Sequence, residues 1–325
     1  MIPVPIMVCG FNRPDMLRKV LEAVREASPQ KLYLVLDAPR PGHDPDWPGY
    51  KECRKLFDSV DWAENVHRNY AETNMGCGKR MTTGINWVFE HEDRAIILED
   101  DCVPDALFFK FCDELLEKYK EDNRIGAISG HMEPIQLKKV NFFGASYCFD
   151  RMFSCWGWAT WRRAWRYHDP KLSYLGTLSS SGMMMELFSS KRYLRLWTDA
   201  IWKIHDGKRN TWAGAWATTI YREGFLVIHP NCNLITNVGT DDSSRSVSKK
   251  MGPTLRIKIK SFFEARRNVL TQSFSFPIKH PASFIINASS ERCFLAECIY
   301  ASIMTKFCRN PLSAMLKVLE RLNII

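Results

Sequence analysis

Short apolar runs alternate with amphipathic stretches through the first 130 residues, and few folds accept such a sequence. Residues 5–11 (PIMVCGF) and 31–38 (KLYLVLDA) have the length and composition of buried strands. Between them, apolar residues recur at helical spacing over residues 16–24. Strands joined by helices through short links form a parallel sheet covered on both faces. The sequence therefore predicts an α/β fold with a central, mostly parallel sheet.

The same patterns continue along the next part of the chain. Strands are expected near residues 64–70, 94–101 and 125–130, with helices between them. Asn12 is expected to cap the first helix with its side chain, and Pro104 to open the helix that follows the fourth strand.

Charged residues follow several of these strands at their carboxyl ends, where ligands bind in parallel sheets. They are Arg13, Asp37 and the run Glu99-Asp100-Asp101. Three adjacent acids repel one another unless a cation or hydrogen-bond donors balance them. Carboxylate oxygens suit Mg²⁺ or Mn²⁺, and such an ion can hold a diphosphate leaving group. The run predicts a metal site, with a solvated turn as the alternative.

The basic excess of the chain is confined to its last quarter. The net charge is +9, yet residues 1–244 hold 31 Lys and Arg against 32 Asp and Glu, whereas residues 245–325 hold 14 against 4. Stretches 255–270 and 310–325 combine apolar faces with basic residues. They predict helices that bind an anionic membrane surface, or else helices packed on the main domain. Few aromatic residues accompany the cations, so nucleic acid is not an expected partner.

The cysteines and the N-terminus indicate a compartment. The 11 cysteines include no CxxC pair and lie mostly in apolar segments, as is typical of buried free thiols in a reducing environment. The first residues lack the basic region and cleavage site of a signal peptide, and no apolar run reaches the roughly 20 residues of a spanning helix. We expect a cytoplasmic protein.

Aromatic residues gather after residue 140, with ten of them in residues 142–167. Trp158, Trp161 and Trp165 recur at i, i+3 and i+7, which predicts a helical face that packs into the core. Trp156 is expected in a loop, where its ring can lie against the apolar face of a sugar.

An ordered set of motifs resembles the bacterial family-2-like glycosyltransferases of GT-A fold, and more distantly the N-acetylglucosaminyltransferase I type. The likeness covers about residues 3–240 and, more faintly, 276–287. The motifs that show it are PIMVCGFNRPDMLRKVLEAV, LYLVLDAPRPG, TNMGCGKRMTTGINWVF, AIILEDDCVPDALFFKFCDELLEKY and WGWATWRRAW.

The resemblance implies a domain layout. A GT-A domain would span residues 1–245, with a nucleotide-sugar-binding half over 1–131 and an acceptor-side half over 132–245. Residues 246–325 would form a basic, helical C-terminal extension.

The resemblance also implies roles for the charged residues at the strand ends. Asp101 matches the metal ligand of the DxD-like motif, for Mn²⁺ or Mg²⁺. Asp100 and Glu99 would face the ribose and sugar of the donor, Asp37 the uracil edge, and Arg13 the same pocket. A plain turn-forming role remains the alternative for Asp37.

Further positions match the nucleotide-lining segment and the acceptor side. Asn74, Gly76, Lys79 and Arg80 would line the nucleotide, and cations in this first helical turn favour a diphosphate there. A solvated turn is the alternative for the two cations. Residues 156 and 158, both tryptophans, would lie on the acceptor side of the cleft.

The expected catalytic base is missing from its place. The N-acetylglucosaminyltransferase I type has an Asp in a W-D-D-W-like stretch, which would take the proton of the acceptor hydroxyl. Residues 211–216 (TWAGAW) match that stretch and contain no acid. Asp206 is the candidate base, with Asp199 and Glu133 as alternatives. The loop over 237–244 matches the segment that closes over the donor in such enzymes, and its residues 241 and 242 are both aspartates that could approach the metal. A surface loop without this role is the alternative.

Together these features predict a metal-dependent glycosyltransferase that moves a hexosyl or N-acetylhexosaminyl group from a nucleotide-diphosphate sugar, with UDP as the expected nucleotide. The acceptor would be a hydroxyl of a glycan or lipid-linked glycan in bacterial surface polysaccharide or lipopolysaccharide synthesis, with inversion at the anomeric carbon. Such an enzyme would be peripheral on the cytoplasmic face of the inner membrane. The alternatives are an inactive GT-A-like binding or scaffold protein, and a sugar-nucleotide pyrophosphorylase. The sequence CGFNRPD lacks the glycine-rich loop of the latter.

Overall fold

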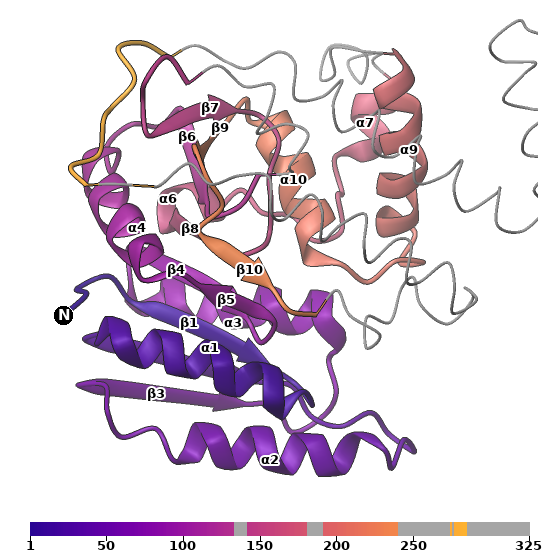
Figure 1. The fold of residues 1–325 in the computed structure, drawn as a ribbon. Helices are drawn as coiled ribbons and strands as arrows, with labels where there is room; N and C mark the ends of the chain where they lie inside the picture. The colour runs from indigo at the N-terminus through magenta and orange to yellow at the C-terminus, as the bar shows by residue number, and fades with distance from the viewer. Residues whose placement is uncertain (133–141, 181–190, 240–273, 275, 285–325) are drawn as a thin grey trace, which may run out of the picture.

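A computed structural model describes residues 1–132, 142–180, 191–239, 274 and 276–284 (Figure 1). The strands are β1 (Ile6–Gly10), β2 (Lys31–Leu36), β3 (Asn65–Tyr70), β4 (Arg94–Glu99), β5 (Cys102–Pro104), β6 (Ile125–Ser129), β7 (Tyr147–Asp150), β8 (Trp158–Trp161), β9 (Leu226–Pro230) and β10 (Ile235–Asn237). The helices are α1 (Pro14–Ala27), α2 (Asp46–Asp58), α3 (Gly76–His91), α4 (Ala106–Lys118), α6 (Arg162–Trp165), α7 (Leu175–Ser180), α9 (Lys191–His205) and α10 (Trp212–Arg222).

Eight strands form the central sheet in the order β3-β2-β1-β4-β8-β6-β9-β7. The first four are parallel, β8 lies antiparallel between β4 and β6, and β7 is antiparallel to β9 at the edge. Strands β5 and β10 pair in a separate two-stranded sheet. The predicted α/β class, with a central and mostly parallel sheet, is confirmed.

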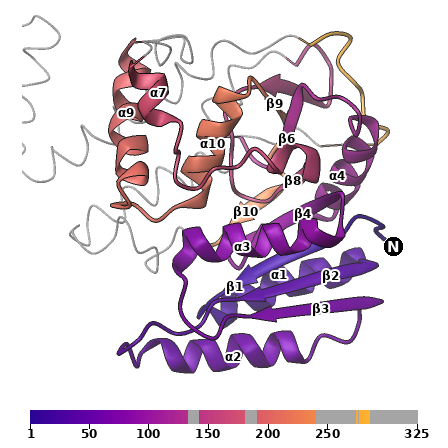
Figure 2. The same cartoon turned by 180° about the vertical axis from the view of Figure 1, so that it is seen from behind.

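Helices cover both faces of this sheet, as expected for strands that alternate with helices along the chain (Figures 1 and 2). In β4, Ile96 and Leu98 belong to the cluster that α1, α2 and α4 complete, whereas Ala95 and Ile97 belong to the cluster that α3, α6 and α10 complete. Successive side chains of a strand point to opposite faces, so one apolar run serves both layers. By the same rule, the side chain of Glu99 points toward α3 and that of Asp100 toward α1.

The predicted helical face of tryptophans is wrong. Residues 158–161 form β8 rather than a helix, so Trp158 and Trp161 point to opposite faces of the sheet. Both rings are buried because both faces are covered. The spacing i, i+3 is compatible with either structure, and Trp165 in α6 completes the pattern by coincidence.

Two predicted helix starts also differ. Arg13, not Asn12, is the N-cap residue of α1, and it makes no side-chain capping bond. The Asn12 amide instead donates to Asp46 Oδ1 at 2.7 Å, in the neighbouring loop before α2. Pro104 ends β5, and Asp105 caps α4 by accepting from the backbone N–H two residues later at 2.8 Å. For Asn12 a contact with a distant loop replaces the expected cap, whereas α4 starts at a local cap one residue after the expected proline.

A short segment near the C-terminus packs against the edge strand β7. Phe274 and Ile278 join the core on the α4 side. Ser146 N–H donates to the Lys279 carbonyl at 2.8 Å, and Phe284 stacks on an aromatic ring of β7 with centroids 4.4 Å apart. We call residues 276–284 the strap. The rest of the predicted extension, with its expected helices, lies outside the described residues.

The described residues also allow the expectations on membrane-spanning helices and on cysteines to be compared with the structure. No helix among them combines the length and the apolar character that crossing a membrane requires. The eight described cysteines are free thiols, and six of them are buried.

Candidate functional site

The acid run lies where β4 leaves the sheet and the chain turns into β5. Glu99 is the last residue of β4, in register with Cys9 of β1. Asp100 is buried and Asp101 is half-buried in the following turn. Because β1, β2 and β4 are parallel, the residues that follow β1 and β2, Arg13 and Asp37, lie at the same edge. The structure thus brings the predicted charged residues to one end of the sheet.

Arg13 bridges the two aspartates. Its Nη1 donates to Asp101 Oδ2 at 2.8 Å, and its Nη2 forms a second charged hydrogen bond with Asp100 Oδ1. Burial lowers the pKa of the Arg13 guanidinium, but the charges of Asp100 and Asp101 outweigh it and raise that pKa overall. This contact was not foreseen, because the sequence places Arg13 nearly 90 residues away from the acids.

One guanidinium does not balance this edge. Asp100 Oδ2 is buried and has no hydrogen-bond partner in the described part of the chain. Burial raises the pKa of Asp100, against the opposing charge of Arg13. Burial, followed by the charges of the two aspartates, raises the pKa of Glu99 to about 8. Asp100 and Asp101 therefore share one guanidinium, and a buried oxygen of Asp100 is left without a hydrogen-bond partner among the described residues.

These residues fit a divalent cation that a ligand helps to hold. The described residues contain no group of three or more His, Cys, Asp and Glu side chains arranged around one metal position. Mg²⁺ is commonly held by one or two carboxylates together with substrate phosphates and water. Asp101 and the orphaned oxygen of Asp100 supply hard ligands of that kind. The fit is to a shared site, completed by a phosphate, rather than to a closed protein cage.

The loop after β10 fixes the position of Asp101. Val238 N–H donates to the Asp101 carbonyl at 2.8 Å, extending the pairing of β10 with β5. Asn237 Nδ2 lies 3.4 Å from Asp101 Oδ1. A Cβ on Gly239 would come within 2.3 Å of Asp101 Oδ2, so only glycine allows this approach. Sequence analysis missed Gly239; its signal was a lone glycine after a short strand, which is weak.

Asp37 does not present an open carboxylate for a base edge. Its Oδ1 accepts from the N–H groups of Ala38 at 3.0 Å and Met75 at 2.9 Å. Its Oδ2 accepts from Gly76 N–H at 2.9 Å and Asn74 Nδ2 at 3.2 Å. A carboxylate offers about four acceptor positions, and all four are used. These bonds hold the start of α3, and the uracil contact stays a prediction.

The other predicted nucleotide-lining residues surround that helix start. Asn74 also donates to the carbonyl of Ala38 at 2.6 Å, and Gly76 opens α3 with φ of 73°. Lys79 is exposed on the first turn, free to face a phosphate. Arg80 is buried and donates to the carbonyl and side chain of Asn69 at the end of β3, and burial lowers its pKa. Arg80 therefore points to β3 rather than into solvent.

The two predicted acceptor-side tryptophans have different surroundings. Trp156 is half-buried, and its ring lies 4.5 Å from that of His131, a buried residue that follows β6. Trp158 is fully buried and stacks on Trp212, with ring centroids 5.3 Å apart. A ring enclosed on both sides cannot contact an acceptor, so the acceptor-side role of Trp158 is corrected to a core role. His131 was not predicted; burial lowers its pKa to about 3 and keeps it neutral.

The predicted base candidates do not join the acid edge in the described residues. Asp206 is an exposed residue after α9, and its carboxylate pairs with Lys208 at 2.8 Å. Asp199 lies on the exposed side of α9, paired with Lys203. Residues 133, 241 and 242 lie outside the described residues. Ala213 and its neighbours at the start of α10 supply no acid.

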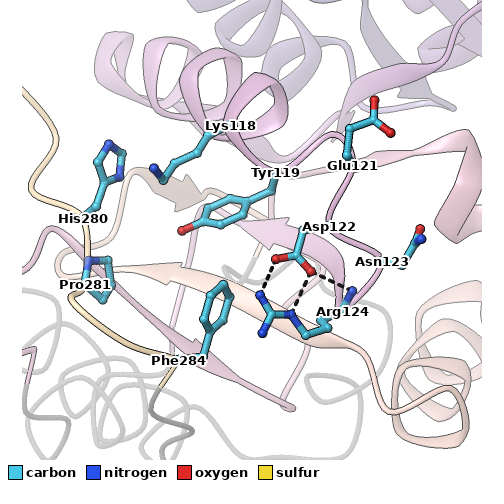
Figure 3. Close-up of a pocket in the computed structure, with 9 residues that line it drawn as sticks. All are labelled: Lys118, Tyr119, Glu121, Asp122, Asn123, Arg124, His280, Pro281 and Phe284. Carbon is cyan, nitrogen blue, oxygen red and sulfur yellow. Dashed lines mark hydrogen bonds and ion pairs between the residues drawn. The ribbon is translucent and has the colours of Figure 1, made fainter.

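A hollow of about 600 Å³ lies at the other end of the sheet, before β6 (Figure 3). The segment after α4 and the strap line it. Arg124 forms two hydrogen bonds to Asp122 and lies 3.9 Å above the ring of Phe284. The charges of Asp122 and Arg124 thus satisfy one another.

The chain is distantly similar to a number of solved structures, including a mannosyltransferase and a pyrophosphorylase. No family model and no curated protein matches the chain. A mannosyltransferase, PcManGT from Pyrobaculum calidifontis in complex with GDP-Man and Mn²⁺, is 13% identical over 69% of each chain, with a TM-score of 0.35. A UDP-glucose pyrophosphorylase complexed with UDP-glucose is 9% identical over 70% of this chain and 90% of that one, also at 0.35. At such scores the functional argument rests on the residues of the site.

Proposed function

We propose that this protein is a glycosyltransferase that binds a nucleotide-diphosphate sugar, with UDP as the nucleotide, at the carboxyl edge of its sheet. The observation that supports it is the acid edge: Asp100 and Asp101 share the Arg13 guanidinium, and one buried oxygen of Asp100 has no hydrogen-bond partner among the described residues. A divalent cation would supply positive charge there, and the diphosphate of the donor would supply further ligands to the cation.

The residues of the edge have separable tasks in this proposal. Asp101 and Asp100 would hold Mn²⁺ or Mg²⁺, which acts when bound as a Lewis acid that stabilises the leaving diphosphate. Arg13 and Lys79 would face the phosphates. Glu99, which lies toward α3 and Trp212, would face the sugar rather than the phosphates.

The finer expectations extend the same proposal. The acceptor would be a hydroxyl of a glycan or lipid-linked glycan in bacterial surface polysaccharide synthesis, and the reaction would invert the anomeric carbon. We further propose that cations of residues 246–325 hold the enzyme on an anionic membrane surface, at the cytoplasmic face of the inner membrane. The resemblance of the sequence motifs supports these points.

A thermal-shift panel tests the proposal. Nucleotide sugars with different bases and sugars are added to the full chain with and without Mn²⁺. We expect one donor class to raise the melting temperature only when Mn²⁺ is present, because a ligand that binds the folded state stabilises it. Asp101→Asn should remove this shift without changing the melting temperature of the free protein greatly. Asp199→Asn, an exposed acid on α9, is the control and should keep the shift.

A second candidate function is donor binding without transfer, favoured by the exposed, ion-paired positions of Asp199 and Asp206. Release of the free nucleotide from the donor, with and without acceptor, separates the two functions. Release of nucleoside triphosphate on adding pyrophosphate would instead indicate a pyrophosphorylase. A panel without any shift contradicts the proposed function.

A further inference from the structure

We propose that Arg13 is a built-in counter-ion of the acid edge, which competes with the divalent cation for Asp101 and yields only when a nucleotide diphosphate is present. This inference rests on the proposed function and adds a coupling between its two ligands.

The first reason is the geometry of the fork. One guanidinium nitrogen of Arg13 bonds to Asp101 and the other to Asp100, so a single side chain occupies an oxygen of each aspartate. A planar guanidinium suits this two-acid contact, whereas a point charge on a lysine does not. The oxygen of Asp101 that Arg13 takes is Oδ2, the one that also lies against the backbone of Gly239.

The second reason is that the two aspartate side chains are more deeply buried than the Arg13 side chain, which can therefore move away from them. The Asp100 and Asp101 side chains are 3% and 17% exposed, whereas that of Arg13 is 32% exposed. Arg13 is held at its backbone, since its carbonyl accepts from Leu17 N–H at 3.0 Å in the first turn of α1. Its side chain can therefore turn outward without disturbing the helix start.

The third reason is that the two cations exclude one another. A divalent ion on Asp101 would lie within a few ångströms of the Arg13 guanidinium, and like charges at such distances repel strongly where water is scarce. Among the described residues, the other partners of the Asp101 side chain are the Asn237 amide and the Cys102 thiol, both 3.4 Å away and uncharged. Within that part of the chain, Arg13 is thus the charged group that a metal must displace from Asp101.

A diphosphate changes this balance. It offers the displaced guanidinium a new anionic partner at the same edge and completes the ligands of the cation. Binding of the nucleotide should then favour binding of the metal, and by linkage the metal should favour the nucleotide by the same factor. The wild-type chain would bind the metal alone weakly and the pair tightly.

The test measures Mn²⁺ affinity of the full chain directly, by the electron paramagnetic resonance signal of free Mn²⁺, with and without UDP. Arg13→Gln should bind Mn²⁺ alone more tightly than the wild type, by about tenfold or more, because the competing charge is gone. The factor by which UDP improves Mn²⁺ binding should shrink in the same variant. Arg13→Lys keeps the charge but can bond to only one of the two aspartates. Its Mn²⁺ affinity should therefore lie between those of the wild type and Arg13→Gln.

Arg94→Gln is the matched control, since Arg94 pairs with Glu117 far from this edge, and it should leave both affinities unchanged. Circular dichroism checks that each variant folds, and the lysine variant serves if the glutamine variant does not. Wild-type Mn²⁺ binding that UDP enhances, with no gain in either Arg13 variant, overturns this inference and leaves the proposed function standing. Absence of Mn²⁺ binding to the wild type, with or without UDP, overturns the proposed function itself.

Discussion

At the scale of single residues, the candidate site depends on contacts between distant parts of the chain. Arg13 reaches Asp100 and Asp101 across the sheet edge, and the loop after β10 closes over the same turn. Gly239 is the tightest of these contacts, because a side chain there has no room beside the Asp101 carboxylate. A methyl group can therefore test how strictly Asp101 must be placed.

Gly239→Ala should weaken Mn²⁺-dependent nucleotide-sugar binding by about tenfold, as misplacing a binding group by about 1 Å costs at least that much. The added Cβ would lie 2.3 Å from Asp101 Oδ2, so the carboxylate or the loop must move. Isothermal titration of donor with Mn²⁺ present measures the effect. Gly176→Ala is the control, because a Cβ at this glycine of α7 meets nothing within 4 Å. Equal affinities in both variants would show that Asp101 does not act from this position.

At the scale of elements, the start of α3 is the clearest unit. Asp37, after β2, accepts hydrogen bonds from the N–H groups of Met75 and Gly76 and so ties the end of β2 to the start of α3, which follows β3 in the chain. Asn210 packs against Gly76 and Gly78, where no side chain would fit. This end of the helix is therefore organised by buried polar contacts.

Asp37→Asn should lower the free energy of unfolding by about 1–3 kcal/mol, because an amide nitrogen cannot accept the backbone N–H groups that the carboxylate now holds. Urea denaturation of the variant and the wild type measures this. Asp199→Asn serves again as the exposed control. Unchanged stability together with a loss of nucleotide affinity would support the base-contact role expected from the sequence.

Sequence reasoning was strongest for the elements and weakest for the contacts between them. Continuous apolar runs such as IMVCG and AIILE predicted the strands, because apolar residues on both faces of a strand indicate a parallel sheet that is covered on both sides. The tryptophans of β8 misled, since Trp158 and Trp161 fit a helix or a doubly covered strand equally well. The charged residues at the edge were found because strand ends are visible in sequence.

Their partners could not be found in the same way. Arg13 bonds to Asp101, Asp37 bonds to the start of α3, and Gly239 lies against Asp101. The residues of each pair are tens of positions apart, and no local sequence pattern encodes such contacts. The Asp206 hypothesis stays a prediction, because the ion pair of this exposed acid with Lys208 does not decide whether it acts as the base.

At the scale of the whole molecule, the chain separates a nearly neutral body from a basic C-terminal part. Residues 245–325 hold 14 Lys and Arg against 4 Asp and Glu. Of these cations, Arg292, Lys306, Arg309, Lys317 and Arg321 follow the strap. If they bind an anionic surface, each should contribute about 1 kcal/mol near the lipid.

Replacing these five cations by Gln in the full chain should abolish co-flotation with vesicles that contain phosphatidylserine. The wild type should float with these vesicles and not with phosphatidylcholine alone, and added salt should release it because the attraction is screened. Replacing Lys19, Lys51 and Arg54, which lie on helices of the body, is the control and should change nothing. Equal flotation of the five-cation variant and the wild type would place any membrane contact elsewhere.

The strap has a consequence for how this protein can be shortened. Strand β7 ends the sheet, and the strap lies along it through the Ser146–Lys279 hydrogen bond and the stacked ring of Phe284. A version that stops ahead of Phe274 would leave this outermost strand bare, and bare strands pair with those of other molecules. Such a fragment should aggregate during purification, whereas a fragment that keeps the residues through 284 should stay monodisperse.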